Sequence, residues 1–117
     1  IDEEGMRQVT HDHSLVAEMV RRGELSSREA SRHPNKNVIT RALGVESNVS
    51  CDVFPLSLKK GQYVLLCSDG LTNEVSEPEI YYEVFQSQAP ERACDTLIEI
   101  ARSRGGHDNI TVVLASF

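Results

Sequence analysis

Residues 65–72 read Leu-Leu-Cys-Ser-Asp-Gly-Leu-Thr, an apolar run that ends in an acid followed by a glycine. The continuous apolar run Tyr63–Cys67 is typical of a strand that is buried on both faces. Asp69 would then stand at the end of a rigid element. Gly70 would permit a sharp turn and leave room for another group close to the backbone. These features make Asp69 the first candidate for a functional residue.

A second acid follows a glycine pair near the C-terminus, where residues 105–111 read Gly-Gly-His-Asp-Asn-Ile-Thr. The β-branched residues within 110–114 predict a final strand, so Asp108 would stand just before it. Two carboxylates at the ends of adjacent strands suit a hard divalent cation such as Mg²⁺ or Mn²⁺. Asp-Gly and Asp-Asn pairs also form ordinary turns, so a purely structural role for each acid stays open.

The segment between the two acids predicts two helices. The first begins at a capping box, Ser76-x-x-Glu79. The second begins at Pro90 and ends at the glycine pair of residues 105–106. Its apolar face is formed by Ala93, Cys94, Leu97, Ile98 and Ala101.

The N-terminal part of the chain is polar and less regular. Its patterns predict a strand end at 6–10, a helix after Ser14, a second helix at 26–30, a helical turn at 38–43 and a half-buried strand at 49–53. The broken helical segment 14–48 has few large apolar residues. It is more typical of a flap than of a core.

Composition excludes several classes of protein. The 117 residues carry 12 basic and 18 acidic side chains, and this net charge of −6 disfavours a nucleic-acid partner that neutralises phosphates. No apolar run is long enough for membrane insertion of this segment. The three cysteines are an odd set without C-x-x-C spacing, which predicts reduced, small core residues in a cytoplasmic protein.

Other kinds of site have weaker support. The histidines, His11, His13, His33 and His107, have no zinc-ligand spacing with the cysteines. Ser14 and Ser68 lack a recognisable His–Asp relay, which argues against a serine nucleophile. Arg41 could hold an anion, although a lone arginine is more often a solvated surface group. From the residues alone, a metal-dependent enzyme is one of several alternatives.

Four motifs in this order carry a family resemblance. They are Thr-His-Asp-His-Ser-Leu-Val at 10–16, His-Pro-Asn-Lys-Asn-Val-Ile-Thr-Arg-Ala-Leu-Gly at 33–44, the residues 65–72, and Gly-Gly-His-Asp-Asn-Ile-Thr-Val-Val at 105–113. Together they resemble the C-terminal half of a bacterial-type protein phosphatase 2C domain, a metal-dependent serine/threonine protein phosphatase. The resemblance implies an α+β fold, half of an α/β/β/α sandwich with antiparallel sheets.

The resemblance also implies roles for individual residues. Asp69 and Asp108 would be catalytic metal ligands in a Mn²⁺ or Mg²⁺ centre with two or more ions in the complete domain. A water held by those ions would attack the phosphorus of phosphoserine or phosphothreonine. Asn109 would position water at the metal. Arg41, in the flap segment 14–48, would contact the substrate.

The other ligands of such a domain belong to an N-terminal half that cannot be assigned in this sequence, which begins at Ile1. We therefore expect residues 1–117 to be a partial catalytic domain that is inactive alone. Its expected partners are that N-terminal half and phosphoprotein substrates of a serine/threonine kinase. A pseudophosphatase or regulatory binding module of the same fold is the alternative, and the two acids favour catalysis over it.

Overall fold

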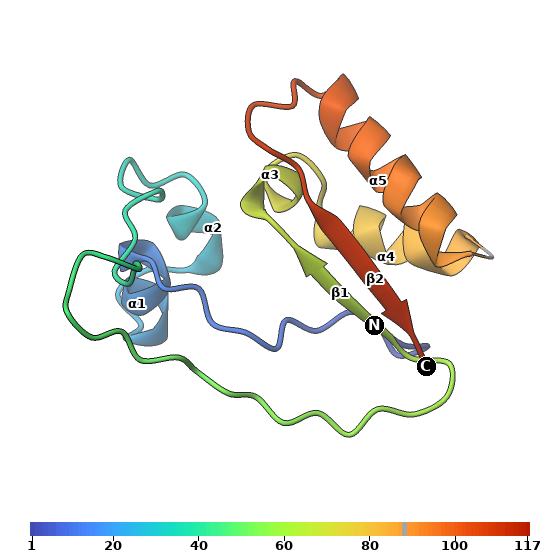
Figure 1. Cartoon of the computed structure of the whole chain (residues 1–117). Helices are drawn as coiled ribbons and strands as arrows, with labels where there is room; N and C mark the ends of the chain where they lie inside the picture. The colour runs from blue at the N-terminus through green and yellow to red at the C-terminus, as the bar shows by residue number, and fades with distance from the viewer. Residues whose placement is uncertain (88) are drawn as a thin grey trace. The chain divides into compact units, whose positions relative to one another are not determined.

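The computed structural model describes residues 1–87 and 89–117 and divides the chain into two compact units (Figure 1). Unit 1 combines Ile1–Arg7 with Leu56–Phe117, and unit 2 spans Gln8–Pro55. The predicted flap segment 14–48 lies within unit 2.

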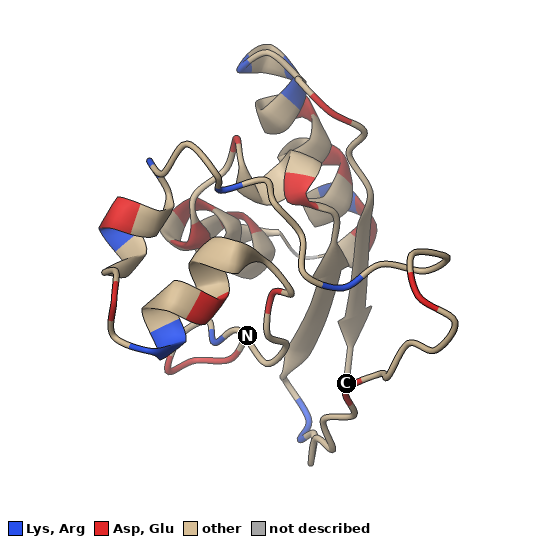
Figure 2. Ribbon diagram, turned by 90° about the vertical axis from the view of Figure 1, so that its left-hand side faces the viewer, with Lys and Arg blue, Asp and Glu red and all other residues tan. Residues whose placement is uncertain are grey.

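Unit 1 is built on an antiparallel pair of strands, β1 (Tyr63–Cys67) and β2 (Val112–Ser116). Cys67 lies opposite Val112, so the end of β1 and the start of β2 share one edge of the sheet. Figure 2 shows that neither strand carries a charged residue. The prediction of β1 is confirmed, whereas β2 begins two residues later than the predicted strand at 110–114.

One face of this sheet packs on the hydrophobic core and the other does not. The core face presents Tyr63, Leu65, Val112 and Leu114. Side chains alternate along a strand, so Leu66 and Val113 point the opposite way, and they are 60% and 52% exposed. The prediction that 63–67 is buried on both faces is therefore wrong, because helices of unit 1 cover only one face.

The core of unit 1 lies between this sheet and three helices, α3 (Asp69–Thr72), α4 (Glu77–Gln86) and α5 (Pro90–Ser103). Figure 1 shows α5 running along β2, with α4 beside α5. The largest fully buried side chains are Leu71, Ile80, Val84, Leu97 and Val75. Burial of one such leucine contributes about 1.5–3 kcal/mol.

Local signals account for α4 and α5 but not for α3. The predicted capping box is present at the start of α4, where the amide and the hydroxyl of Ser76 both donate to Oε2 of Glu79. Pro90 opens α5, as predicted, and Ala93, Leu97 and Ala101 form its buried side.

None of the helices in the described parts of the chain combines the length and apolar character needed to cross a membrane.

Unit 2 contains the two short helices that the sequence predicts, α1 (Leu15–Arg21) and α2 (Ser27–Ala30). The Ser14 hydroxyl accepts a hydrogen bond from the Ala17 amide at the start of α1. Ser26 and Glu29 form a capping box at the start of α2.

Three other expectations for the N-terminal part are wrong. Residues 6–10 and 49–53 form no strand, and residues 38–43 form no helical turn. Residues 38–43 are extended because they pair with the residues just before α1. Ile39 forms a β-bridge with Ser14, and the amide of Thr40 donates to the carbonyl of His13 at 2.8 Å. The bridge satisfies backbone groups that a helical turn would have paired locally.

The cysteines are free, as predicted, but their expected place in the core is only partly correct. Cys51 and Cys67 are exposed, and Cys94 is half-buried. Burial raises the pKa of the Cys94 thiol.

Candidate functional site

The two predicted acids lie at one edge of the unit 1 sheet. Asp69 is the first residue of α3 and is separated from β1 by Ser68, and Asp108 lies in the loop before β2. Because Cys67 pairs with Val112, the loops that follow β1 and precede β2 leave the sheet at the same edge. Both acids are exposed, and their side chains are accessible to a ligand from solvent.

Ser68 links the two acid-bearing loops. Its amide donates to the carbonyl of Thr111 at 3.0 Å, and its hydroxyl donates to the carbonyl of Asn109 at 2.9 Å. The same hydroxyl oxygen accepts a hydrogen bond from the Thr111 amide at 3.0 Å. Ser68 is thus a bridge between the loops.

Gly70 allows the loops to approach closely. A Cβ atom at this position would lie 2.9 Å from the carbonyl carbon of Asn109 and closer still to its oxygen. Real Cβ atoms do not make such contacts, so the backbone of Asn109 occupies space that any other residue would fill. Gly70 is buried, although Asp69 beside it is exposed.

The chemistry of this edge fits a hard divalent cation. Asp69 and Asp108 offer carboxylate oxygens from two loops in contact, and Oδ1 of Asp108 accepts from the Asn109 amide at 2.7 Å. Within residues 1–87 and 89–117, no group of three or more His, Cys, Asp and Glu side chains could hold a metal ion. A cation bound here would therefore complete its coordination with water or with groups outside these residues, as Mg²⁺ commonly does.

The sequence did not reveal the link through Ser68. Ser68 is the N-cap of α3, but its side chain makes no capping hydrogen bond there. Its hydrogen bonds to Asn109 and Thr111 join residues more than 40 positions apart, and only the pairing of β1 with β2 brings them together.

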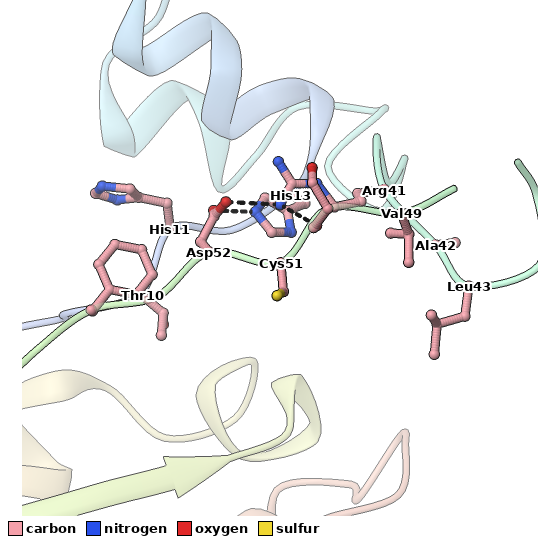
Figure 3. A pocket seen from close by; sticks show the side chains of 11 residues that line it. Thr10, His11, His13, Arg41, Ala42, Leu43, Val49, Cys51 and Asp52 are labelled. Atoms are coloured by element: carbon pink, nitrogen blue, oxygen red, sulfur yellow. Dashed lines mark hydrogen bonds and ion pairs between the residues drawn. The ribbon is translucent and has the colours of Figure 1, made fainter. Parts of the chain in front are cut away.

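Arg41, the fourth predicted site residue, belongs to unit 2, where it forms an ion pair with Asp52. Its Nη1 donates to Oδ1 of Asp52 at 2.9 Å and to the carbonyl of Ser50 at 3.0 Å (Figure 3). Nε2 of His13 lies 2.8 Å from Oδ2 of the same carboxylate. Arg41 therefore links residues 50–52 to the segment around position 41. Its contact with substrate stays a prediction.

This cluster lines an open cavity of about 370 Å³ within unit 2. His11 and Phe54, whose rings meet edge to face, also line it, together with Thr10, Ala42, Leu43, Val49, Ser50 and Cys51. Hydrogen bonds from His13 and then Arg41 lower the pKa of Asp52 from 3.8 to about 2.

The lowered pKa of Asp52 predicts an acid-dependent contribution to the stability of unit 2. Since the folded value lies below the ordinary one, the contribution is complete above about pH 4 and is lost as the pH falls from about 4 to about 2. We expect Asp52→Asn to lower the urea midpoint clearly at pH 6 and by much less near pH 2, where the folded carboxyl is half protonated, as measured by circular dichroism. Glu24→Gln, exposed in the same unit, should change neither midpoint. An equal deficit of Asp52→Asn at both pH values would contradict this account.

Comparisons with known proteins show similarity to serine/threonine phosphatases. A family model described as Stage II sporulation protein E (SpoIIE) matches residues 19–117. A serine/threonine phosphatase, stp, of Listeria innocua is 48% identical over 109 residues, which cover 93% of this chain and 43% of the relative. The crystal structure of the serine/threonine phosphatase Stp1 from Staphylococcus aureus superimposes with a TM-score of 0.94 at 36% identity, covering 100% of this chain and 46% of that one.

A further solved structure contains metal. It is the catalytic domain of the serine threonine protein phosphatase PstP in complex with two manganese ions, which is 34% identical with a TM-score of 0.76 over 97% of this chain and 46% of that one. The chain thus spans less than half the length of each of these three relatives. The predicted likeness to the C-terminal half of a protein phosphatase 2C-type domain is confirmed, and the chain belongs to the family described as Stage II sporulation protein E (SpoIIE).

Proposed function

We propose that this chain forms part of a metal-dependent serine/threonine protein phosphatase, in which Asp69 and Asp108 are catalytic metal ligands. The observation that carries the proposal is the convergence of the two acid-bearing loops, with Ser68 bonded to Asn109 and Thr111 and Gly70 against Asn109. A turn-forming role for each acid separately does not require two distant loops to meet.

The residues of this chain would hold Mn²⁺ or Mg²⁺ and fix its position. Asp69 would contribute from the start of α3 and Asp108 from the loop before β2, each through carboxylate oxygens. The cation, when bound, supplies an activated water and neutralises charge on the phosphate oxygens. Asn109, held by its backbone to Ser68, would orient that water with its amide side chain. The remaining ligands would come from the rest of the domain.

The proposal extends to the substrate and its setting. The substrates would be phosphoserine and phosphothreonine residues of proteins modified by a serine/threonine kinase, and the flap segment 14–48 with Arg41 would contact them. A reducing compartment such as the cytoplasm is supported by the free cysteines Cys51, Cys67 and Cys94.

A chimaera with a known phosphatase tests this function. In it, this chain replaces the segment of the Listeria innocua phosphatase that it matches over 109 residues. We expect the chimaera to hydrolyse p-nitrophenyl phosphate and a phosphothreonine peptide only with Mn²⁺ or Mg²⁺, and this chain alone to do neither. A folded chimaera that binds Mn²⁺ without hydrolysing either substrate would favour the alternative, a regulatory module of the same fold.

A further inference from the structure

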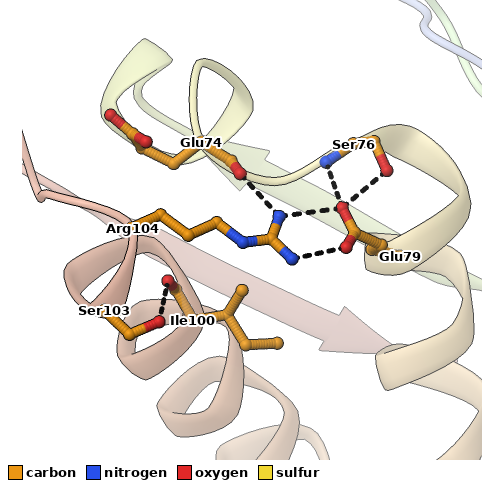
Figure 4. A network of polar contacts seen from close by, with 6 residues as sticks. All are labelled: Glu74, Ser76, Glu79, Ile100, Ser103 and Arg104. Carbon is orange, nitrogen blue, oxygen red and sulfur yellow. Dashed lines mark hydrogen bonds and ion pairs between the residues drawn. The ribbon is translucent and has the colours of Figure 1, made fainter.

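A polar network joins the end of α5 to the segment that follows α3 (Figure 4). Arg104, the residue after α5, donates from Nη1 and Nη2 to the two carboxylate oxygens of Glu79, at 3.0 and 2.6 Å. Nη1 also donates to the backbone carbonyl of Glu74 at 2.7 Å. Two parallel hydrogen bonds from one guanidinium fix its orientation, which the point charge of a lysine does not.

Glu79 is itself fixed at the start of α4. Its Oε2 accepts hydrogen bonds from the amide and the hydroxyl of Ser76, at 2.9 and 2.7 Å. Hydrogen bonds from Arg104 and Ser76 hold the pKa of Glu79 well below its usual range, so this carboxylate stays charged at any pH used for an assay. The next residue, Ile80, is fully buried in the core. Arg104 is therefore bonded to the start of α4, beside the core of unit 1.

Glu74 carries the network to both acids. Its carbonyl binds Arg104, and Oε1 of its side chain lies 2.6 Å from Nδ1 of His107, the residue before Asp108. On the other side, the amide of Glu74 donates to the carbonyl of Leu71 within the turn that begins at Asp69. Glu74 thus connects the segment of Asp69 with the loop of Asp108.

This connection matters because the Asp108 loop starts with two glycines. Gly105 and Gly106 have φ values of +132° and +54°, and glycine imposes little restraint of its own. Arg104 holds the chain immediately before the pair, and His107 holds it immediately after. The amides of Gly105 and Gly106 donate to the carbonyls of Arg102 and Ala101 at 3.2 and 3.1 Å, so the pair closes α5, and Asp108 follows the anchor at His107.

We infer that Arg104 is a positioning residue that sets the separation of the Asp69 and Asp108 carboxylates through its clamp on Glu79 and Glu74. The inference rests on the proposed function, because it concerns the same cation site. Without the clamp, the two acids are correctly placed in only a fraction of the molecules, and the apparent affinity for a divalent cation falls to that fraction of its value.

The test is Mn²⁺ binding to the chimaera, measured by calorimetry. Arg104→Lys keeps the positive charge but loses the paired hydrogen bonds, and we expect it to raise the Kd for Mn²⁺ roughly tenfold, as changes to groups that orient metal ligands do. Glu79→Gln should act in the same direction, and the double variant should add little to Arg104→Lys because the two residues act as a unit. Arg102→Lys, two residues earlier on α5 and exposed, should leave the Kd unchanged.

Two further measurements separate the possible failures. If Arg104→Lys lowers the unfolding temperature in EDTA but leaves the Kd unchanged, the clamp is only structural and the inference is wrong. If Asp108→Asn weakens Mn²⁺ binding while Arg104→Lys does not, the inference fails and the proposed site stands. If Asp108→Asn also binds Mn²⁺ like the native chain, the proposed site itself fails and the inference with it.

Discussion

Asp108→Asn and Asp69→Asn should each lower kcat/KM of the chimaera for p-nitrophenyl phosphate by at least about 100-fold, the upper end of the loss caused by changes to groups around metal ligands. Asparagine is nearly isosteric with aspartate, so the fold should survive while a charged oxygen ligand is lost. The double variant should lose far less than the product of the two single losses, because ligands of one centre act as a unit.

The control for this prediction is Asp95→Asn. Asp95 is exposed on α5, in the same unit as both acids, and the substitution is identical. It should leave kcat/KM and the Mn²⁺ concentration for half-maximal activity unchanged. Native activity and an unchanged Mn²⁺ titration in both Asp69→Asn and Asp108→Asn would mean that these acids only form turns.

The helices were predictable because their signals are local. Ser14, Ser26 and Ser76 each begin a helix, and the bonds that cap it reach only three residues along the chain. The apolar face of α5 likewise repeats within a single segment. A pattern contained in one turn of helix does not depend on what the rest of the chain does.

The N-terminal errors arose where a distant partner decides the structure. Residues 38–43 have a helical pattern, but Ile39 bridges to Ser14, 25 positions away, and the segment stays extended. Residues 49–53 alternate between apolar and polar types as a strand does, but they are not paired with a strand in the described structure. Asp52 instead binds the side chains of Arg41 and His13. Neither pairing leaves a mark in the local sequence.

The placement of Asp69 and Asp108 at one edge of the sheet was predictable, whereas the contacts at that edge were not. An acid after an apolar strand and an acid before a β-branched one indicate a common edge, and the register of β1 with β2 agrees. The contacts that hold the edge together were not visible, because the hydroxyl of Ser68 and the guanidinium of Arg104 bind backbone carbonyls. Any residue type has a carbonyl, so the sequence cannot identify such acceptors.

Gly70→Ala should disrupt the same edge of the sheet by a steric clash, without removing a charge. The added Cβ would lie 2.9 Å from the carbonyl carbon of Asn109, so the start of α3 and the Asp108 loop must move apart. We expect a loss of about 1–3 kcal/mol of stability, typical of overpacking, measured by urea unfolding. The displaced carboxylates should also bind Mn²⁺ at least tenfold more weakly in calorimetry, because their shared position is lost.

Gly61→Ala separates this effect from the cost of replacing any glycine. Gly61 precedes β1, at the end of the strand away from Asp69, and a Cβ there meets nothing within 4 Å. Its φ of +88° makes alanine strained, at a cost of about 1–3 kcal/mol. The two variants should therefore lose similar stability, while only Gly70→Ala loses Mn²⁺ affinity. If both variants, or neither, weakened Mn²⁺ binding, the approach of Gly70 to Asn109 would not be what places Asp69 and Asp108 for binding the cation.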